Sequence, residues 1–257
     1  MPAAKLELPV AFINVPYSKR YERVYLAFIA GVSAYGLTPS AAVRDPSSRF
    51  QLERIYELIA GAQYSFHDLS FMSLDRQSPQ TPRLNMAFEL GLAVAVSRNA
   101  GSNHQWFVFD TVPYRLDKAL SDLGGVRPRI HNRSPESVLR ALMNVLGRLT
   151  DRPTFADLLN VYREVEKGAR RIKRNYSLDL FDTKPFAELI FIAHETAERY
   201  VPSSPSRSYG YGVASLHVIA INLAIALSVS PHDSSRASVP DIIACGARLR
   251  ISCFAIA

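Results

Sequence analysis

Short apolar runs alternate with amphipathic runs along the first part of the chain, and this alternation limits the possible folds more than any other feature. The apolar runs have the length of strands, and the runs between them repeat apolar residues with helical spacing. Strands that alternate with helices favour parallel βαβ units. The predicted strands cover 10–15, 38–43, 64–69, 105–110 and 127–131, and the predicted helices cover 21–35, 49–60, 85–97, 115–120 and 134–149.

Five such units predict an α/β domain over residues 8–150, a flavodoxin-like parallel sheet with helices on both faces. The pattern changes after residue 150, where helices are predicted over 155–174 and 186–200 with no strand between them. We therefore expect a second, α-helical C-terminal region over 151–257, whose role the sequence does not indicate. Its apolar stretch 213–229 is shorter than the ~20 residues that span a bilayer, so it predicts a buried helix and no membrane span.

The composition excludes several classes of function. The net charge is +7, and five basic residues cluster within 167–174, a pattern that indicates a solvated helix face more than a phosphate-binding patch. No nucleic-acid motif accompanies it, so a nucleic-acid partner is not expected. The two cysteines, Cys245 and Cys253, have no metal-binding spacing, and we expect no metal and no disulfide framework. The N-terminus lacks the apolar core of a signal peptide, and a cytoplasmic location is expected.

One carboxylate stands out because its surroundings are apolar. Glu89 lies near the start of the predicted helix 85–97, between Phe88 and Leu90. A charge is costly to bury without a partner, so this carboxyl is predicted to have a raised pKa or to be paired. A paired Glu89 would form a salt bridge with Arg83 or Arg44, whereas an unpaired one suits an acid, a base or a nucleophile.

A second carboxylate, Asp68, ends the strand that precedes this helix. Ligands of open α/β sheets bind outside the carboxyl ends of the strands, so we expect Asp68 and Glu89 to meet at one crevice. A turn-capping role for Asp68 is an equal alternative. His67 alternates to the opposite face of the strand and is predicted to pack in the core. Asp110 ends the next strand, where a turn cap is favoured over a place in the crevice.

The loop after the first strand supplies further candidates. Asn14, Tyr17 and Ser18 lie between that strand and the following helix, where backbone amides favour anions. Tyr17 either stacks on a ligand ring or packs locally. Asn85 lies one helical turn before Glu89 and Arg83 lies two residues further upstream, and both are predicted to line the same pocket. The chain has no glycine-rich phosphate loop, no nucleophile elbow and no zinc-protease motif.

The run Phe88-Glu89-Leu90-Gly91-Leu92-Ala93, after a strand that carries an aspartate, resembles the nucleoside 2-deoxyribosyltransferase family. Toll/interleukin-1 receptor (TIR) domains share the flavodoxin-like layout, and their enzymatic members cleave NAD with a glutamate at a related position. The resemblance covers residues 10–131. It implies that Glu89 is the catalytic glutamate, that Asp68 lies near the base or sugar, and that the loop 14–18 contacts the ligand. The transferases carry Asp-x-Gly-Thr before this helix where the chain has residues 83–86, which leaves hydrolysis open.

The expected activity is therefore cleavage of an N-glycosidic bond in a nucleoside, a nucleotide or NAD, by hydrolysis or ribosyl transfer. No cofactor is implied, because NAD would be the substrate. The TIR comparison also implies a homo-oligomer, a protein partner for the C-terminal helices and a role in bacterial defence. Two alternatives from other classes are a nucleotide-sensing module without turnover and a TIR-like assembly module.

Overall fold

The computed structural model describes residues 8–44, 51–72, 78–147 and 153–201. Five parallel strands form one sheet in the order β2-β1-β3-β4-β5, as the sequence predicts. The strands are β1 (Val10–Asn14), β2 (Thr38–Ser40), β3 (Tyr64–Asp68), β4 (Gln105–Asp110) and β5 (Arg129–Ile130). β2 and β5 are shorter than predicted, and both are the edge strands of the sheet.

The described helices alternate with these strands and then follow them. They are η1 (Lys19–Tyr21), α1 (Glu22–Ala34), α2 (Gln51–Ala60), α3 (Asn85–Arg98), α4 (Arg115–Ala119), η2 (Ser121–Leu123), α5 (Pro135–Leu146), α6 (Phe155–Asn175) and α7 (Thr183–Tyr200). All seven predicted helices are present within a few residues of their predicted ends. Ser134 begins α5 as predicted, because its side chain accepts a hydrogen bond from the Ser137 amide. None of the helices in the described ranges is long and apolar enough to cross a bilayer.

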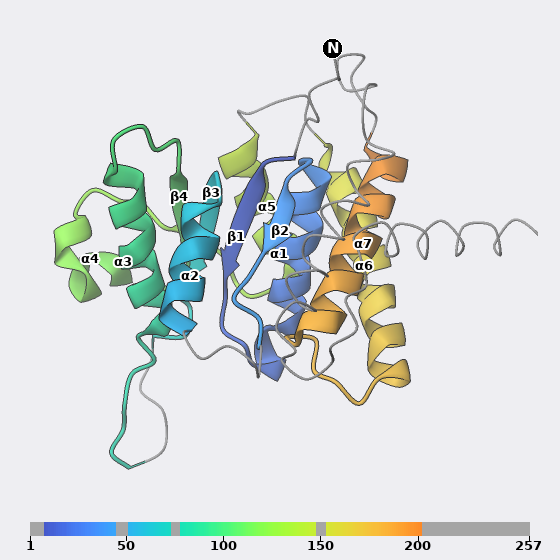
Figure 1. The fold of residues 1–257 in the computed structure, drawn as a ribbon, viewed down its shortest axis with the longest axis horizontal. Helices are drawn as coiled ribbons and strands as arrows, with labels where there is room; N and C mark the ends of the chain where they lie inside the picture. Colours follow the sequence, from blue (N-terminus) through green and yellow to red (C-terminus); the bar gives the residue numbers. More distant parts are fainter. Residues whose placement is uncertain (1–7, 45–50, 73–77, 148–152, 202–257) are drawn as a thin grey trace, which may run out of the picture.

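The helices cover both faces of the sheet (Figure 1). On one face, α1 and α5 pack against inward residues such as Ile13, Phe66 and Phe109. On the other face, α2 and α3 pack against Phe12. Successive strand residues point to opposite faces, so each strand residue can be assigned to one helix layer.

The two long helices α6 and α7 pack against α1, on the same side of the sheet as α5 (Figure 1). Leu158, Val165 and Leu189 belong to the same hydrophobic core as the sheet residues that α1 covers. The α6–α7 contact is close, because a Cβ on Gly168 would lie 2.5 Å from Cδ1 of Ile192. The described part of the helical C-terminal region is therefore packed onto the α/β domain, and the apolar stretch 213–229 lies outside the described residues.

Candidate functional site

The strand order reverses between β1 and β3, and open α/β sheets bind ligands at this point. The chain passes from β1 to β2 on one side, and then returns to place β3 on the other side of β1. The loops that leave the carboxyl ends of β1 and β3 therefore separate and leave room above the sheet. Glu89 and the loop residues Tyr17 and Ser18 come from the elements around this point.

Asn14, the last residue of β1, is buried and holds the start of α3. Its side-chain amide donates to the carbonyl of Met86 at 3.1 Å and to Nδ1 of His67 at 3.0 Å. Both amide hydrogens are therefore used inside the protein. Asn14 was predicted to bind substrate, but in this structure it positions the helix that carries Glu89.

His67 continues this contact into a hydrogen-bonded chain under α2 and α3. Because Nδ1 of His67 accepts from Asn14, its Nε2 carries the proton and donates to Oγ of Ser65 at 2.9 Å. Ser65 then donates to Nε2 of His104 at 2.9 Å, and Nδ1 of His104 donates to the Ala62 carbonyl at 2.7 Å. Every bond in the chain runs in one direction. Burial lowers the pKa of His67 to about 3, and repulsion between the protonated forms of His67 and His104 acts in the same direction.

Glu89 lies on the second turn of α3 and is half-buried. It makes no hydrogen bond or ion pair with any described residue, and burial raises its pKa to about 7. Neither predicted partner is available in this structure. Arg44 binds Asp179 at 3.1 Å, and the guanidinium of Arg83 lies 5.5 Å from the centre of the Phe71 ring.

Tyr17 lies within electrostatic range of Glu89, because the Glu89 charge adds to burial in raising the pKa of the Tyr17 hydroxyl. Its ring stacks on Phe181 at 5.1 Å between centroids and meets Tyr25 edge-on at 6.3 Å. The ring therefore packs locally, which was one of the two predicted roles. Ser18 is half-buried and precedes η1, whose first turn its side chain does not cap. Asn85 is exposed at the first position of α3.

Asp68 does not meet Glu89, contrary to the expectation of a shared crevice. Its neighbour His67 points to the α3 face, so Asp68 points to the face that α1 and α5 cover. There Oδ1 accepts from the amide of Ser70 at 2.8 Å and from the Ser70 hydroxyl, and Oδ2 lies 3.3 Å from Nε2 of His131. Asp68 is fully buried and has no exposed surface.

His131 is a residue to which the sequence analysis gave no role. It follows β5 directly, is buried, and its Nδ1 accepts from the amide of Arg133 at 3.1 Å, which leaves Nε2 as the donor to Oγ of Ser70 at 3.2 Å. Oδ2 of Asp68 lies nearby but has no hydrogen-bond partner among the described residues. The sequence could have indicated His131 by its position. It directly follows the end of β5, and Asn14 and Asp68 are likewise the last residues of β1 and β3.

Asp110, which ends β4, caps the following turn, as the sequence favoured. Its Oδ1 accepts from the amide of Val112 at 3.1 Å, and its Oδ2 accepts from Nε of Arg115 at 3.0 Å. The Asp110 charge is therefore neutralised within the loop.

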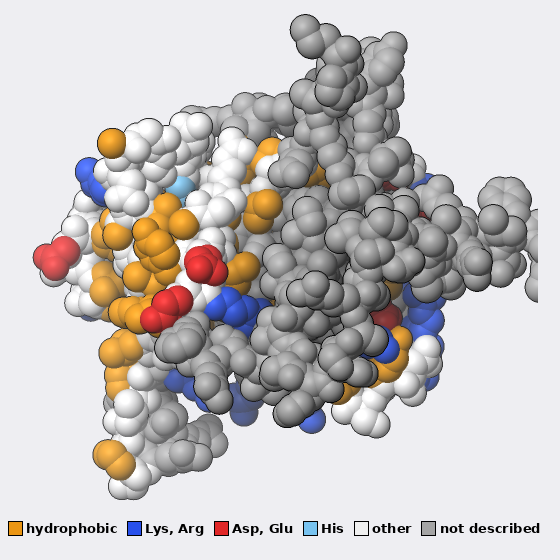
Figure 2. All heavy atoms as spheres, viewed as in Figure 1, with side chains coloured by type: hydrophobic (Ala, Val, Ile, Leu, Met, Phe, Trp, Pro, Cys, Tyr) orange, Lys and Arg blue, Asp and Glu red, His pale blue; other side chains and the backbone are white. Residues whose placement is uncertain are grey.

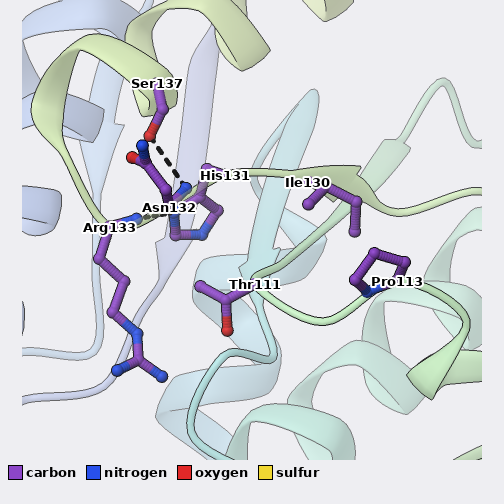
Figure 3. Close-up of a pocket in the computed structure, with 7 residues that line it drawn as sticks. All are labelled: Thr111, Pro113, Ile130, His131, Asn132, Arg133 and Ser137. Carbon is purple, nitrogen blue, oxygen red and sulfur yellow. Dashed lines mark hydrogen bonds between the residues drawn. The ribbon is translucent and has the colours of Figure 1, made fainter.

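Two further surfaces lie near these residues. Apolar side chains gather over α2 and α3 in Figure 2, where Leu52, Tyr56, Leu84 and Phe88 are exposed. An open depression lies at the carboxyl ends of β4 and β5, beside the start of α5 (Figure 3).

Comparisons with protein-family models, with curated proteins and with solved structures find no match to this chain. The case for any function therefore depends on the geometry of these residues.

Proposed function

We propose that the protein cleaves an N-glycosidic bond in a nucleoside, a nucleotide or NAD, with Glu89 as the catalytic carboxylate. The observation that carries the proposal is the state of Glu89: half-buried, without a partner among the described residues, and with a pKa raised to about 7. Carboxyls with no structural partner and a shifted pKa are enriched at functional sites. Glu89 also lies beside the point where the strand order reverses.

The chemistry uses the ionised form of Glu89. Its carboxylate attacks the anomeric carbon or stabilises the ribosyl cation, while the bond to the base breaks and the base nitrogen takes the electron pair. Water then releases the ribosyl group. The Tyr17 hydroxyl stays protonated because burial and the Glu89 charge raise its pKa, so it is a hydrogen-bond donor near the carboxylate. A pKa of about 7 predicts turnover that rises with pH through neutrality.

A product screen tests this proposal. The purified chain is incubated with NAD, NADP, deoxynucleosides and nucleoside monophosphates, and the released bases are separated by chromatography. Release of nicotinamide or a nucleobase that falls ~100-fold or more in Glu89→Gln supports the catalytic role. Glu57→Gln is the matched control, because Glu57 is an exposed acid on α2. Equal turnover by Glu89→Gln and the parent protein would exclude Glu89 as the catalytic group.

The exposed apolar residues over α2 and α3 favour a second candidate, an assembly module with TIR-like layout. Phe88 is 55% exposed beside Glu89, and a cluster of this kind marks an interaction surface. Light scattering after size exclusion tests it: Phe88→Ser is expected to shift an oligomer toward the monomer. Phe191→Ser on α7, where Phe191 is 42% exposed, is the control that should leave the mass unchanged. A monomer at all concentrations of the parent protein would exclude this candidate.

A further inference from the structure

A depression of about 620 Å³ opens where β4 and β5 end, beside the first turn of α5 (Figure 3). Its lining comes from the β4–α4 loop, the end of β5 and the β5–α5 loop, and it shares no lining residue with α3 or with the loop after β1. The lining residues are Thr111, Pro113, Ile130, His131, Asn132, Arg133 and Ser137. The depression is therefore separate from the surroundings of Glu89.

The accessible charge of this depression is positive. Arg133 is exposed and forms no ion pair with a described residue. Its guanidinium lies 5.6 Å from the centre of the Tyr21 ring, and its Nη2 lies 3.5 Å from the Ser70 carbonyl, a long hydrogen bond. The two aspartates nearby offer no accessible negative charge, because Asp110 binds Arg115 and Asp68 is enclosed beneath His131.

The backbone before α5 holds Arg133 in place. Arg133 has a φ of 66°, a left-handed conformation that is uncommon for a residue with a side chain. Its amide donates to His131, and the flanking turn is closed by a bond from the Ser134 amide to Oδ1 of Asn132 at 3.0 Å. Local strain of this kind persists only where the surroundings enforce it, and it is enriched at ligand sites.

The polar groups of the lining that make no hydrogen bond with a described residue are donors. Oδ1 of Asn132 is used by the turn, whereas its Nδ2 makes no hydrogen bond with a described residue. The Thr111 hydroxyl is buried and has no hydrogen-bond partner among the described residues, so it can rotate toward a ligand without breaking a bond. The Asn132 amide turns toward Ser137, whereas the Thr111 hydroxyl lies on the same side as the Arg133 guanidinium (Figure 3). Arg133 and Thr111 together favour an acceptor-rich, negatively charged ligand.

The opposite wall is apolar. Pro113 and Ile130 line it, and Ile130 is 44% exposed. We propose that this depression binds a small molecule that carries a phosphate or a carboxylate, with the anionic group on Arg133 and the Thr111 hydroxyl and an apolar body against Ile130 and Pro113. The site is independent of the proposed glycosidic cleavage at Glu89.

Titration of the full chain with inorganic phosphate, acetate, phenyl phosphate and benzoate tests the site, with backbone amide NMR signals as the readout. We expect saturable shifts at residues 132–134, 136 and 137, tighter binding of the two probes that carry a ring, and the same affinities in Glu89→Gln. Arg133→Gln should weaken binding ~10-fold, and Arg133→Lys should recover part of it. Arg129→Gln is the matched control, because Arg129 is exposed on β5 and does not line the depression.

The pattern across probes identifies the ligand class. Preference for the two phosphates indicates a phosphate ester, and preference for the two carboxylates indicates an organic acid. Absence of saturation by all four probes, or equal binding by Arg133→Gln and the parent protein with its thermal unfolding unchanged, would overturn the proposal. Loss of base release in Glu89→Gln with phosphate binding intact would separate this site from the catalytic one.

Discussion

Asp68 and Glu89 are two carboxyls on consecutive elements of the chain, but they differ in burial and in hydrogen-bond partners. Asp68 is fully enclosed, accepts two hydrogen bonds from Ser70 and lies against His131. Glu89 is only half-buried and has no partner among the described residues. Oδ1 of Asp68 is used inside the protein by the amide and hydroxyl of Ser70, so Asp68 serves the fold. A carboxyl without donors has its pKa raised, which leaves Glu89 available for chemistry.

The largest expected effect is that of Asp68→Ala. The substitution removes the acceptor for the Ser70 amide and hydroxyl and leaves His131 facing an empty space. We expect the free energy of unfolding to fall by ~3–5 kcal/mol, the range for breaking a buried polar cluster. Urea titration measures it, and Asp122→Ala, at an exposed position in η2, is the control. A loss below ~1 kcal/mol would show that Asp68 is not needed for the fold.

Acid should weaken the fold through His67. The folded pKa of about 3 lies below the ordinary value of 6.5, so the neutral form is favoured in the folded state. The stability from this group is present above pH 6.5 and is lost as the pH falls toward 3. We expect ~3 kcal/mol of this stability to be lost between pH 6.5 and pH 4. His67→Gln should flatten the dependence on pH, measured by urea titration from pH 7 to pH 4. An unchanged slope would contradict the hydrogen-bonded chain.

Glu89→Gln should change the stability of the fold mainly at high pH, and it should increase that stability. The folded pKa of about 7 lies above the ordinary 4.5, so ionisation of Glu89 costs stability as the pH rises from 4.5 to 7. The uncharged amide removes this cost. Partial exposure limits the gain to ~1 kcal/mol at pH 8, with no gain at pH 4. Thermal unfolding at the two pH values measures the difference, and a mutant that is less stable at pH 8 would indicate a partner for Glu89.

The smallest effect on stability is expected from Tyr17→Phe. The ring keeps its stacking contact with Phe181, and only the hydroxyl near Glu89 is lost. The free energy of unfolding should change by less than ~0.5 kcal/mol, while base release by Glu89 should slow. Thermal unfolding and the chromatographic assay give the two readouts. A large loss of stability with unchanged turnover would assign the hydroxyl to the fold alone.

The sequence predicted the elements well because their signal is local. Apolar spacing gave each strand and helix within a few residues. The apolar neighbours of Glu89 predicted either a raised pKa or a paired carboxyl, and in the structure the pKa of Glu89 is raised. The sequence did not predict that Asp68 and Glu89 lie apart, because the face of a strand residue depends on which helix layer covers it. His67 and Asp68 alternate, so only one of them can point toward α3.

Other parts of the site depend on contacts between distant residues. Asn14 ends a strand and resembles a ligand contact in sequence, but its amide is used by His67 and Met86, which are 53 and 72 residues away. The left-handed backbone conformation at position 133 could not be predicted, because the residue there is an arginine and not a glycine or an asparagine. The stacking of Phe181 on Tyr17 joins a loop between two helices to a loop after β1, and no periodic pattern encodes such a contact.

That contact has a thermodynamic consequence. The ring of Tyr17 is shared between the α/β domain and the segment that joins α6 to α7. A ligand that stacks on the face of the Tyr17 ring now covered by Phe181 must first separate the two rings, which costs ~1 kcal/mol for an aromatic pair. Linkage is reciprocal, so any partner that draws the α6–α7 junction away from the sheet makes the ring easier to bind by the same amount. The stacking contact between Phe181 and Tyr17 thereby lowers the affinity of the loop after β1 for any ligand that binds the Tyr17 ring.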